Sequence, residues 1–149
     1  MPSWLLLVPA ALQAVVIAVD EGWYHRRRGL PRWERLGHPL DTATVAAALA
    51  WLVATTPRPA TLATYAALAA ASCLFITKDE PVHARLCGPG EHWLHALLFV
   101  LHPLTFVGLG VLWWQGGHAS LVAAQLGLTL VFLTYQLVYW NVLRRGEAP

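Results

Sequence analysis

Carboxylates and imidazoles gather in two short stretches of the chain that match one another. Seven of the eight acidic residues and six of the seven histidines lie in or beside these stretches. The first stretch contains, in order, Asp20-Glu21, His25 and Glu34-x-x-x-His38-Pro39. The second contains Asp79-Glu80, His83, Glu91-x-x-x-His95 and His102-Pro103. Solvated loop residues have no need to repeat the same types at similar offsets, so the repetition indicates that these side chains act together.

Helical spacing predicts which of these side chains converge. Residues four apart share one face of a helix, as Glu34 and His38 do, and as Glu91 and His95 do. Four helices that each direct a carboxylate and an imidazole inward follow the general plan of a dinuclear metal site. We therefore predict eight metal ligands: Glu21, His25, Glu34, His38, Glu80, His83, Glu91 and His95. Mixed oxygen and nitrogen ligands suit two divalent metal ions, with iron favoured and zinc or manganese as alternatives.

Other polar residues near the two stretches are predicted to support these ligands or to replace one of them. They are Asp20, Asp41, Asp79, His92 and His102. The sequence leaves open which acid of each Asp-Glu pair binds a metal, and whether the histidines hold a haem or a quinone instead. Taken singly, a residue such as His92 or His118 is better explained as a solvated group at a helix end.

Long apolar segments must position these groups. The chain is 57% hydrophobic and 12% charged, and the charged share is about half of that usual in soluble domains. Five apolar segments approach the roughly 20 residues that cross a bilayer: 4–19 (extended toward Tyr24), 36–55, 61–76, 93–114 and 120–140. Each of these segments must be helical, because lipid offers no partner to unpaired backbone groups. Glycine and proline mark the connections at 29–31, 57–59, 87–90 and 116–117.

The repeated stretches also predict a repeated fold. In each, an acid pair ends one apolar segment and Glu-x-x-x-His opens the next. We predict an all-α integral membrane protein with five transmembrane helices, in which two parallel-repeat helical hairpins form a four-helix bundle beside the fifth helix. The chain 1–149 is then a single membrane domain, with the repeats at about 4–56 and 60–115 and the fifth helix at about 118–142.

Basic residues predict the orientation in the membrane. With five spans, nine of the ten lysines and arginines fall on one side, including Arg144 and Arg145 after the last span, and only Arg58 falls on the other. The positive-inside rule makes the basic side cytoplasmic. The expected location is the inner (cytoplasmic) membrane, with the N-terminus outside, the C-terminus in the cytoplasm and both acidic stretches at the cytoplasmic face.

The pattern of ligands resembles the membrane di-iron hydroxylases and desaturases, which place histidine motifs at the cytosolic face. His92-x-x-His95 has part of their histidine-box spacing, and Glu80-Pro81-Val82-His83 has the Glu-x-x-His spacing of soluble di-iron proteins. The complete His-x-x-x-His and His-x-x-His-His boxes are absent, so the resemblance covers the ligand chemistry alone. The chain is also similar to a small bacterial family of multi-spanning membrane proteins with Asp-Glu…His and Glu…His-Pro repeats, a similarity that implies no function.

Three functions fit these observations. The resemblance favours a di-iron oxidoreductase or oxygenase that takes a lipophilic small molecule from the bilayer and electrons from a donor. A zinc-dependent membrane hydrolase or isomerase would use a metal-bound water as its nucleophile. A metal-binding carrier or sensor is the third, although the first three spans offer few polar groups for a path across the membrane. No extended basic face suggests nucleic acid, and neither a P-loop nor a Gly-x-Ser-x-Gly motif is present.

Overall fold

The computed structural model describes residues 3–144, and this part of the chain contains helices and no strand. Arg145 and Glu147 lie outside the described residues. Five helical segments are long and apolar enough to cross a membrane: Ser3–Arg28, Arg32–Ala54, Pro59–Leu86, Pro89–Gln115 and Ala119–Leu143. The prediction of an all-helical chain with five helices of membrane-spanning length is confirmed.

Three of the five segments change helical type along their length. The first comprises a 3-10 turn (η1, Ser3–Leu7), α1 (Val8–Val19), a π-helical turn (η2, Asp20–His25) and α2 (Arg26–Arg28). The second is α3 (Arg32–Ala54) throughout. The third comprises α4 (Pro59–Phe75), a 3-10 turn (η3, Ile76–Asp79) and α5 (Glu80–Leu86). The fourth is α6 (Pro89–Gln115), and the fifth comprises α7 (Ala119–Val138) and a π-helical turn (η4, Tyr139–Leu143).

The connections at the polar end are shorter than the gaps between the predicted apolar segments, which run from 19 to 36 and from 76 to 93. Only residues 29–31 separate α2 from α3, and only residues 87–88 separate α5 from α6. Gly29 turns the first connection with a φ of 77°, a conformation that costs glycine little. Pro89 opens α6 at the first helical position, where its missing N–H leaves no bond unmade. The acids and histidines expected beside loops therefore lie on helices, which fixes their directions.

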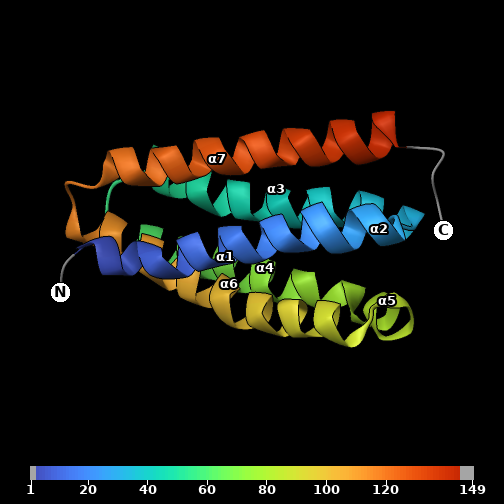
Figure 1. Cartoon of the computed structure of the whole chain (residues 1–149). Helices are drawn as coiled ribbons and strands as arrows, with labels where there is room; N and C mark the ends of the chain where they lie inside the picture. The colour runs from blue at the N-terminus through green and yellow to red at the C-terminus, as the bar shows by residue number, and fades with distance from the viewer. Residues whose placement is uncertain (1–2, 145–149) are drawn as a thin grey trace.

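Packing between the helices relates the two repeats. α1 packs on α6, and α3 packs on α4. In the predicted repeat, α1 corresponds to α4 and α3 corresponds to α6. The contact of α1 with α6 in one direction is therefore equivalent to the contact of α4 with α3 in the other. α7 runs along α3 on one side of the bundle (Figure 1). Pro39 in α3 has no N–H, and the carbonyl of Arg35, one turn earlier, accepts a hydrogen bond of 3.0 Å from Asn141 Nδ2 at the end of the last helix.

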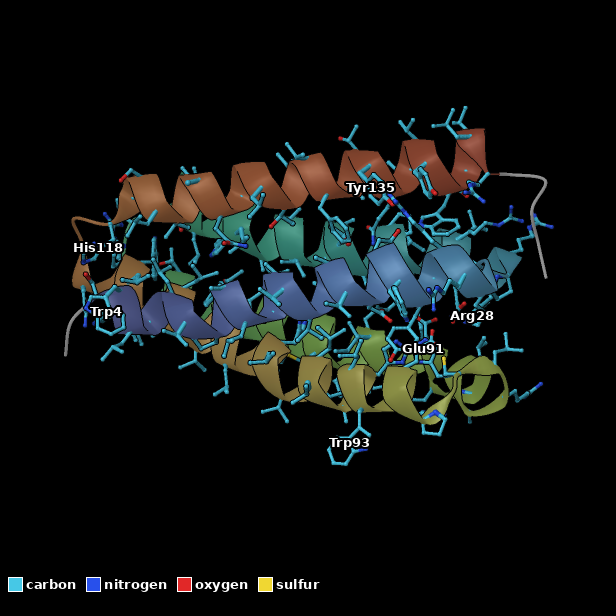
Figure 2. The ribbon with its side chains drawn as sticks, viewed as in Figure 1. Trp4, Arg28, Glu91, Trp93, His118 and Tyr135 are labelled. Atoms are coloured by element: carbon cyan, nitrogen blue, oxygen red, sulfur yellow. The ribbon has the colours of Figure 1, made fainter. Side chains whose placement is uncertain are left out.

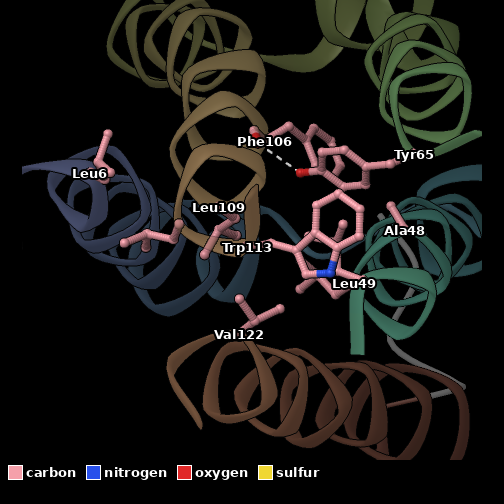
Figure 3. Packing of buried hydrophobic residues seen from close by; sticks show 10 residues of the cluster. Leu6, Ala48, Leu49, Tyr65, Phe106, Leu109, Trp113 and Val122 are labelled. Carbon is pink, nitrogen blue, oxygen red and sulfur yellow. Dashed lines mark hydrogen bonds between the residues drawn. The ribbon is translucent and has the colours of Figure 1, made fainter. Parts of the chain in front are cut away.

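The apolar core fills the half of the bundle away from the acids and histidines. Leu49, Leu109 and Leu112 are almost completely buried there, around Tyr65 and Trp113 (Figure 3). The Tyr65 hydroxyl donates a hydrogen bond of 2.7 Å to the Phe106 carbonyl (Figure 3). The outer surface carries many exposed apolar side chains, such as Leu12, Val15, Val107 and Val131, which suits helices that face lipid.

Gly108 permits the close approach of the first helix to α6. A Cβ at this position would overlap the Leu6 carbonyl, which belongs to rigid backbone. We expect Gly108→Ala to lower the free energy of unfolding by about 1–3 kcal/mol through overpacking. Gly127→Ala is the matched control, because nothing lies within 4 Å of its added Cβ and alanine favours a helix by about 1 kcal/mol. Thermal unfolding in detergent measures both, and equal stability of the two variants would contradict this packing.

Candidate metal centre

The two repeated stretches differ by one residue, and a π-helical turn accommodates the difference. His25 follows Asp20 by five residues, whereas His83 follows Asp79 by four. Asp20–His25 forms a π-helical turn, which takes in one more residue than an α-helical turn and is frequent at functional sites. Despite the extra residue in the first repeat, His25 therefore faces the interior of the bundle as His83 does.

Asp20, His25, Glu91 and His95 form the first ligand group. One donor atom from each side chain lies within 4.8 Å of the others, and all four residues are buried. Asp20 Oδ2 lies 3.2 Å from His25 Nε2 and 3.3 Å from His95 Nε2. Glu91 Oε1 lies 3.8 Å from His25 Nε2. The group joins the end of the first helix to the start of α6.

Glu34, His38 and His83, with Asp79 beside them, form the second ligand group. The first three place donor atoms within 4.8 Å of one another. Glu34 Oε1 lies 3.2 Å from His83 Nε2, and Asp79 Oδ2 lies 4.0 Å from His38 Nε2. These two pairs are the counterparts of Glu91 with His25 and of Asp20 with His95. Each group thus contains two imidazoles and two carboxylates, and each draws on both repeats.

The two ligand groups touch through their imidazole rings. The ring centroids of His25 and His38 are 4.9 Å apart, and those of His83 and His95 are 4.0 Å apart. Each of these contacts joins one histidine of the first group to one of the second. The eight side chains therefore form one continuous cluster, which contains six of the predicted ligands together with Asp20 and Asp79 in the places predicted for Glu21 and Glu80.

The glutamate of each Asp-Glu pair contacts the Nδ1 atom of a histidine, on the side of the ring away from the cluster. Glu21 Oε2 lies 3.1 Å from His25 Nδ1, and Glu80 Oε1 lies 3.5 Å from His83 Nδ1. Both rings thereby direct Nε2 toward the cluster. Glu21 also accepts a hydrogen bond from Trp140 Nε1. A carboxylate on the outer nitrogen of a metal-binding histidine orients the ring and raises its basicity.

Arg28 connects the two ligand groups. Its guanidinium donates to Glu34 Oε2 at 2.7 Å and to Glu91 Oε1 at 2.9 Å. Figure 2 shows Arg28 and Glu91 facing each other, whereas Trp93 points away from the bundle and Trp4 and His118 lie at the opposite end. From the sequence, Arg28 is one of the basic residues that predict the orientation in the membrane. Its spacing of three from His25 and seven from Glu21 is the helical signal that places it on the inner face.

Negative charge dominates the cluster. The carboxylates of Asp20, Glu21, Glu34, Asp79 and Glu91 are all buried. Lys78 contacts both Asp79 at 2.8 Å and the further carboxylate of Asp41 at 2.7 Å. With neutral histidines, these six carboxylates and the two cations Arg28 and Lys78 carry a net charge of −4. Two divalent cations would neutralise this charge. Five buried nitrogen and oxygen atoms of the cluster also lack a hydrogen-bond partner within residues 3–144: Asp20 Oδ1, His25 Nε2, both ring nitrogens of His83, and His95 Nδ1. Buried polar atoms of this kind need a partner, so the donor set fits metal ions.

Three of the supporting residues predicted from the sequence lie outside the two ligand groups. Asp41 is bound through both oxygens to Lys78 Nζ at 2.7 Å. His102 accepts from Gln13 Nε2 at 3.0 Å and lies 3.1 Å from Ser72 Oγ, so it has partners of its own. His92 is half-buried and belongs to none of the clusters described. Asp20, by contrast, belongs to the first ligand group. Asp79 lies at the edge of the second, since its Oδ2 accepts from Lys78 Nζ at 2.8 Å and lies 4.0 Å from His38 Nε2.

Cys87 and Trp33 are further neighbours that the spacing did not single out. Cys87 Sγ could join His83 and His95, but burial raises the pKa of its thiol to about 12 and keeps it protonated. Trp33 Nε1 donates to Asp79 Oδ1 at 2.8 Å. No helical pattern connects Trp33 with Asp79 in the sequence, because the contact joins two different repeats.

Comparison of the chain with models of known protein families, with curated proteins and with solved structures finds no match.

Proposed function

We propose that this protein is a membrane-embedded metalloenzyme with a dinuclear His/carboxylate centre, a di-iron oxidoreductase that acts on a lipophilic substrate. One observation supports it above all others, namely the two matched ligand groups of two imidazoles and two carboxylates that touch through their histidines. Loop residues that merely balance arginines would not be buried, would not converge from both repeats and would not leave a net charge of −4.

The proposed ligands differ from the sequence prediction at the two acid pairs. Asp20, His25, Glu91 and His95 would hold one ion, and Glu34, His38, Asp79 and His83 the other. Glu21 and Glu80 would hold the outer nitrogens of His25 and His83 instead of binding metal. Glu80 fits this role because its side chain is 47% exposed, far more than any residue assigned as a ligand.

Iron is the proposed metal because the donor set mixes carboxylate oxygen and imidazole nitrogen without a thiolate. Such a centre supplies oxidation by dioxygen, in which one oxygen atom enters a C–H bond of the substrate and the other leaves as water with two electrons and two protons from a donor. The protein's own contribution is to orient the imidazoles, to keep the carboxylates buried and to limit access of water.

Metal content tests the proposal. We expect protein purified in detergent without added metal to contain two iron ions per chain by elemental analysis, and the Glu34→Ala/Glu91→Ala variant to contain none. A His92→Ala/His118→Ala variant is the control, since both histidines lie outside the ligand groups. Zinc with no response to oxygen would favour the hydrolase. No bound metal, even after loading with iron or zinc, would refute both enzyme hypotheses.

The location in the membrane is part of the proposal. α2 and α5 lie at the same end of the bundle (Figure 1). The cluster residues belong to these helices or to the segments next to them, as do the basic residues Arg26, Arg27, Arg32, Lys78 and Arg85. The positive-inside rule supports a cytoplasmic position for this end in an inner membrane. An electron donor from the cytoplasm would then reach the centre without crossing the bilayer.

A further inference from the structure

A cavity of about 370 Å³ extends from the metal cluster into the apolar half of the bundle. α1, α3, α6 and α7 all contribute to its walls. Along α1 and η2 the lining runs from Ala10 to His25, a length of ~20 Å at the rise of an α-helix. The cavity is therefore elongated along the bundle, and we call it the channel. Such a shape fits one extended hydrocarbon chain better than a ring system.

The channel is open along the seam between α1 and α7. α1 packs on α6, and α7 packs on α3, so neither covers the other. Ala14 and Ala18 on α1 and Leu128 on α7 line the channel and are also exposed on the outer surface. The small alanine side chains leave this side of the channel accessible from the surface that faces lipid. An apolar molecule can therefore enter sideways, without passing through water.

The character of the walls changes along the channel. Next to the cluster, apolar residues such as Ile17, Leu98 and Phe132 line the channel together with the polar pair Thr42 and Gln136, which are hydrogen-bonded to each other. Farther along, beside His102, two polar atoms lack a partner in the described chain, Gln13 Oε1 and Thr105 Oγ1. Thr105 is only 7% exposed. A longer hydrocarbon chain would leave these atoms unpaired, so its end should turn out through the open seam into the bilayer.

The charge of the walls defines the head group of the ligand. Among the described residues that line the channel, none is a lysine or an arginine. Arg28 is already bound to Glu34 and Glu91. Two divalent ions at the cluster would only offset its net charge of −4, so a carboxylate or phosphate head would add a negative charge that no further cation balances. A neutral hydroxyl or carbonyl can accept from or donate to the polar groups at the cluster without this cost.

We propose that the channel binds a single-chain neutral amphiphile, a long-chain alcohol or aldehyde, with its polar head at the cluster and its hydrocarbon tail directed toward the seam between α1 and α7. This inference specifies the lipophilic substrate of the proposed function. It rests on that function only for the presence of metal ions beside the head group. Reaction at the head of the chain, and not at its tail, follows from this orientation.

Photolabelling with two probes tests the orientation. One is hexadecanol with a diazirine at the end of its tail, and the other carries the diazirine beside the hydroxyl group. We expect the tail probe to label segments 10–14 of α1 and 125–128 of α7, and the head probe to label segments 20–25 and 91–95. Unlabelled hexadecanol should compete and hexadecanoate should not. The reverse distribution, label spread over the outer surface, or equal competition by the acid would overturn the proposal.

Ala14→Phe provides the matched variant, because its side chain would fill the channel from the exposed seam. We expect labelling to fall at least tenfold in Ala14→Phe and to stay unchanged in Ala11→Phe, whose side chain lies on the exposed face of the same helix outside the channel. Metal content measured on the same samples separates the two proposals. Bound iron with indiscriminate labelling refutes the channel alone, whereas specific labelling without metal supports the channel and refutes the di-iron centre.

Discussion

Asp20→Asn should remove one of the two metal ions and leave the other in place. Asp20 belongs to the first ligand group, and its Oδ2 lies within 3.3 Å of both histidines of that group. Asparagine keeps the size of the side chain but loses the negative charge that offsets a divalent ion. The second ligand group retains Glu34, His38, Asp79 and His83 in this variant. Elemental analysis of the purified protein should give one ion per chain.

Asp79→Asn is the counterpart and should also leave one ion, held by the first ligand group. The Asp20→Asn/Asp79→Asn double variant should bind none. Glu21→Gln and Glu80→Gln are the matched controls, because each glutamate contacts the outer nitrogen of a histidine and neither is assigned to a ligand group. Glutamine can still accept the hydrogen bond that Trp140 donates to Glu21. Both controls should keep both ions with an affinity lowered by roughly 10–100-fold, as is typical for groups that orient a ligand. Loss of an ion in Glu21→Gln but not in Asp20→Asn would show that the glutamate of the pair is the ligand.

Much of the fold could be predicted because it depends on simple physical requirements. Five apolar segments of membrane-spanning length must be helical, and the structure has five such helices. The helix ends were less predictable, because polar residues at the ends of apolar segments look like loops. Glu34 and Glu91 lie in the first turns of α3 and α6, two residues before the predicted apolar segments 36–55 and 93–114. Hydropathy alone does not distinguish a polar helix end from a loop.

The convergence of the site could also be predicted, but its internal roles could not. The repeated offsets identified Glu34, His38, Glu91 and His95, and these four side chains do lie in the cluster. Which acid of each pair faces inward depends on the π-helical turn at Asp20–His25 and on the 3-10 turn at Ile76–Asp79. Each changes the direction of a side chain by a large part of a helical turn. No periodicity in the sequence predicts either change of helical type.

The channel could not be predicted because it depends on the pairing of distant helices. Its open side exists because α7 packs on α3 and leaves α1 uncovered. In the sequence, Ala14 and Leu128 are ordinary members of two apolar segments. Only their placement on either side of the same cavity gives them a shared role.

Arg28→Met should destabilise the metal-free protein far more than the metal-bound protein. The guanidinium contacts Glu34 and Glu91, which are 0% and 3% exposed. Removal of one partner from a buried ion pair costs about 3–5 kcal/mol, because the remaining charge has no compensation. Without metal, the cluster of the variant would carry a net −5. Two divalent ions would reduce this to −1, so binding of metal should restore most of the lost stability.

Arg27→Met is the control for this variant, since Arg27 lies over the Trp23 ring on the exposed side of the same helix. Its loss should cost only about 0.5–1 kcal/mol, with or without metal. Thermal unfolding in detergent, followed by circular dichroism with chelator and with added iron, measures all four states. An equal loss of stability in both states of Arg28→Met would mean that the ions do not lie beside Glu34 and Glu91. A larger gain of thermal stability from metal in Arg28→Met than in the wild type would instead show that the arginine and the ions share the same two carboxylates. Arg28 would then be a fixed cation of the site, and the two metal ions would supply the remaining positive charge.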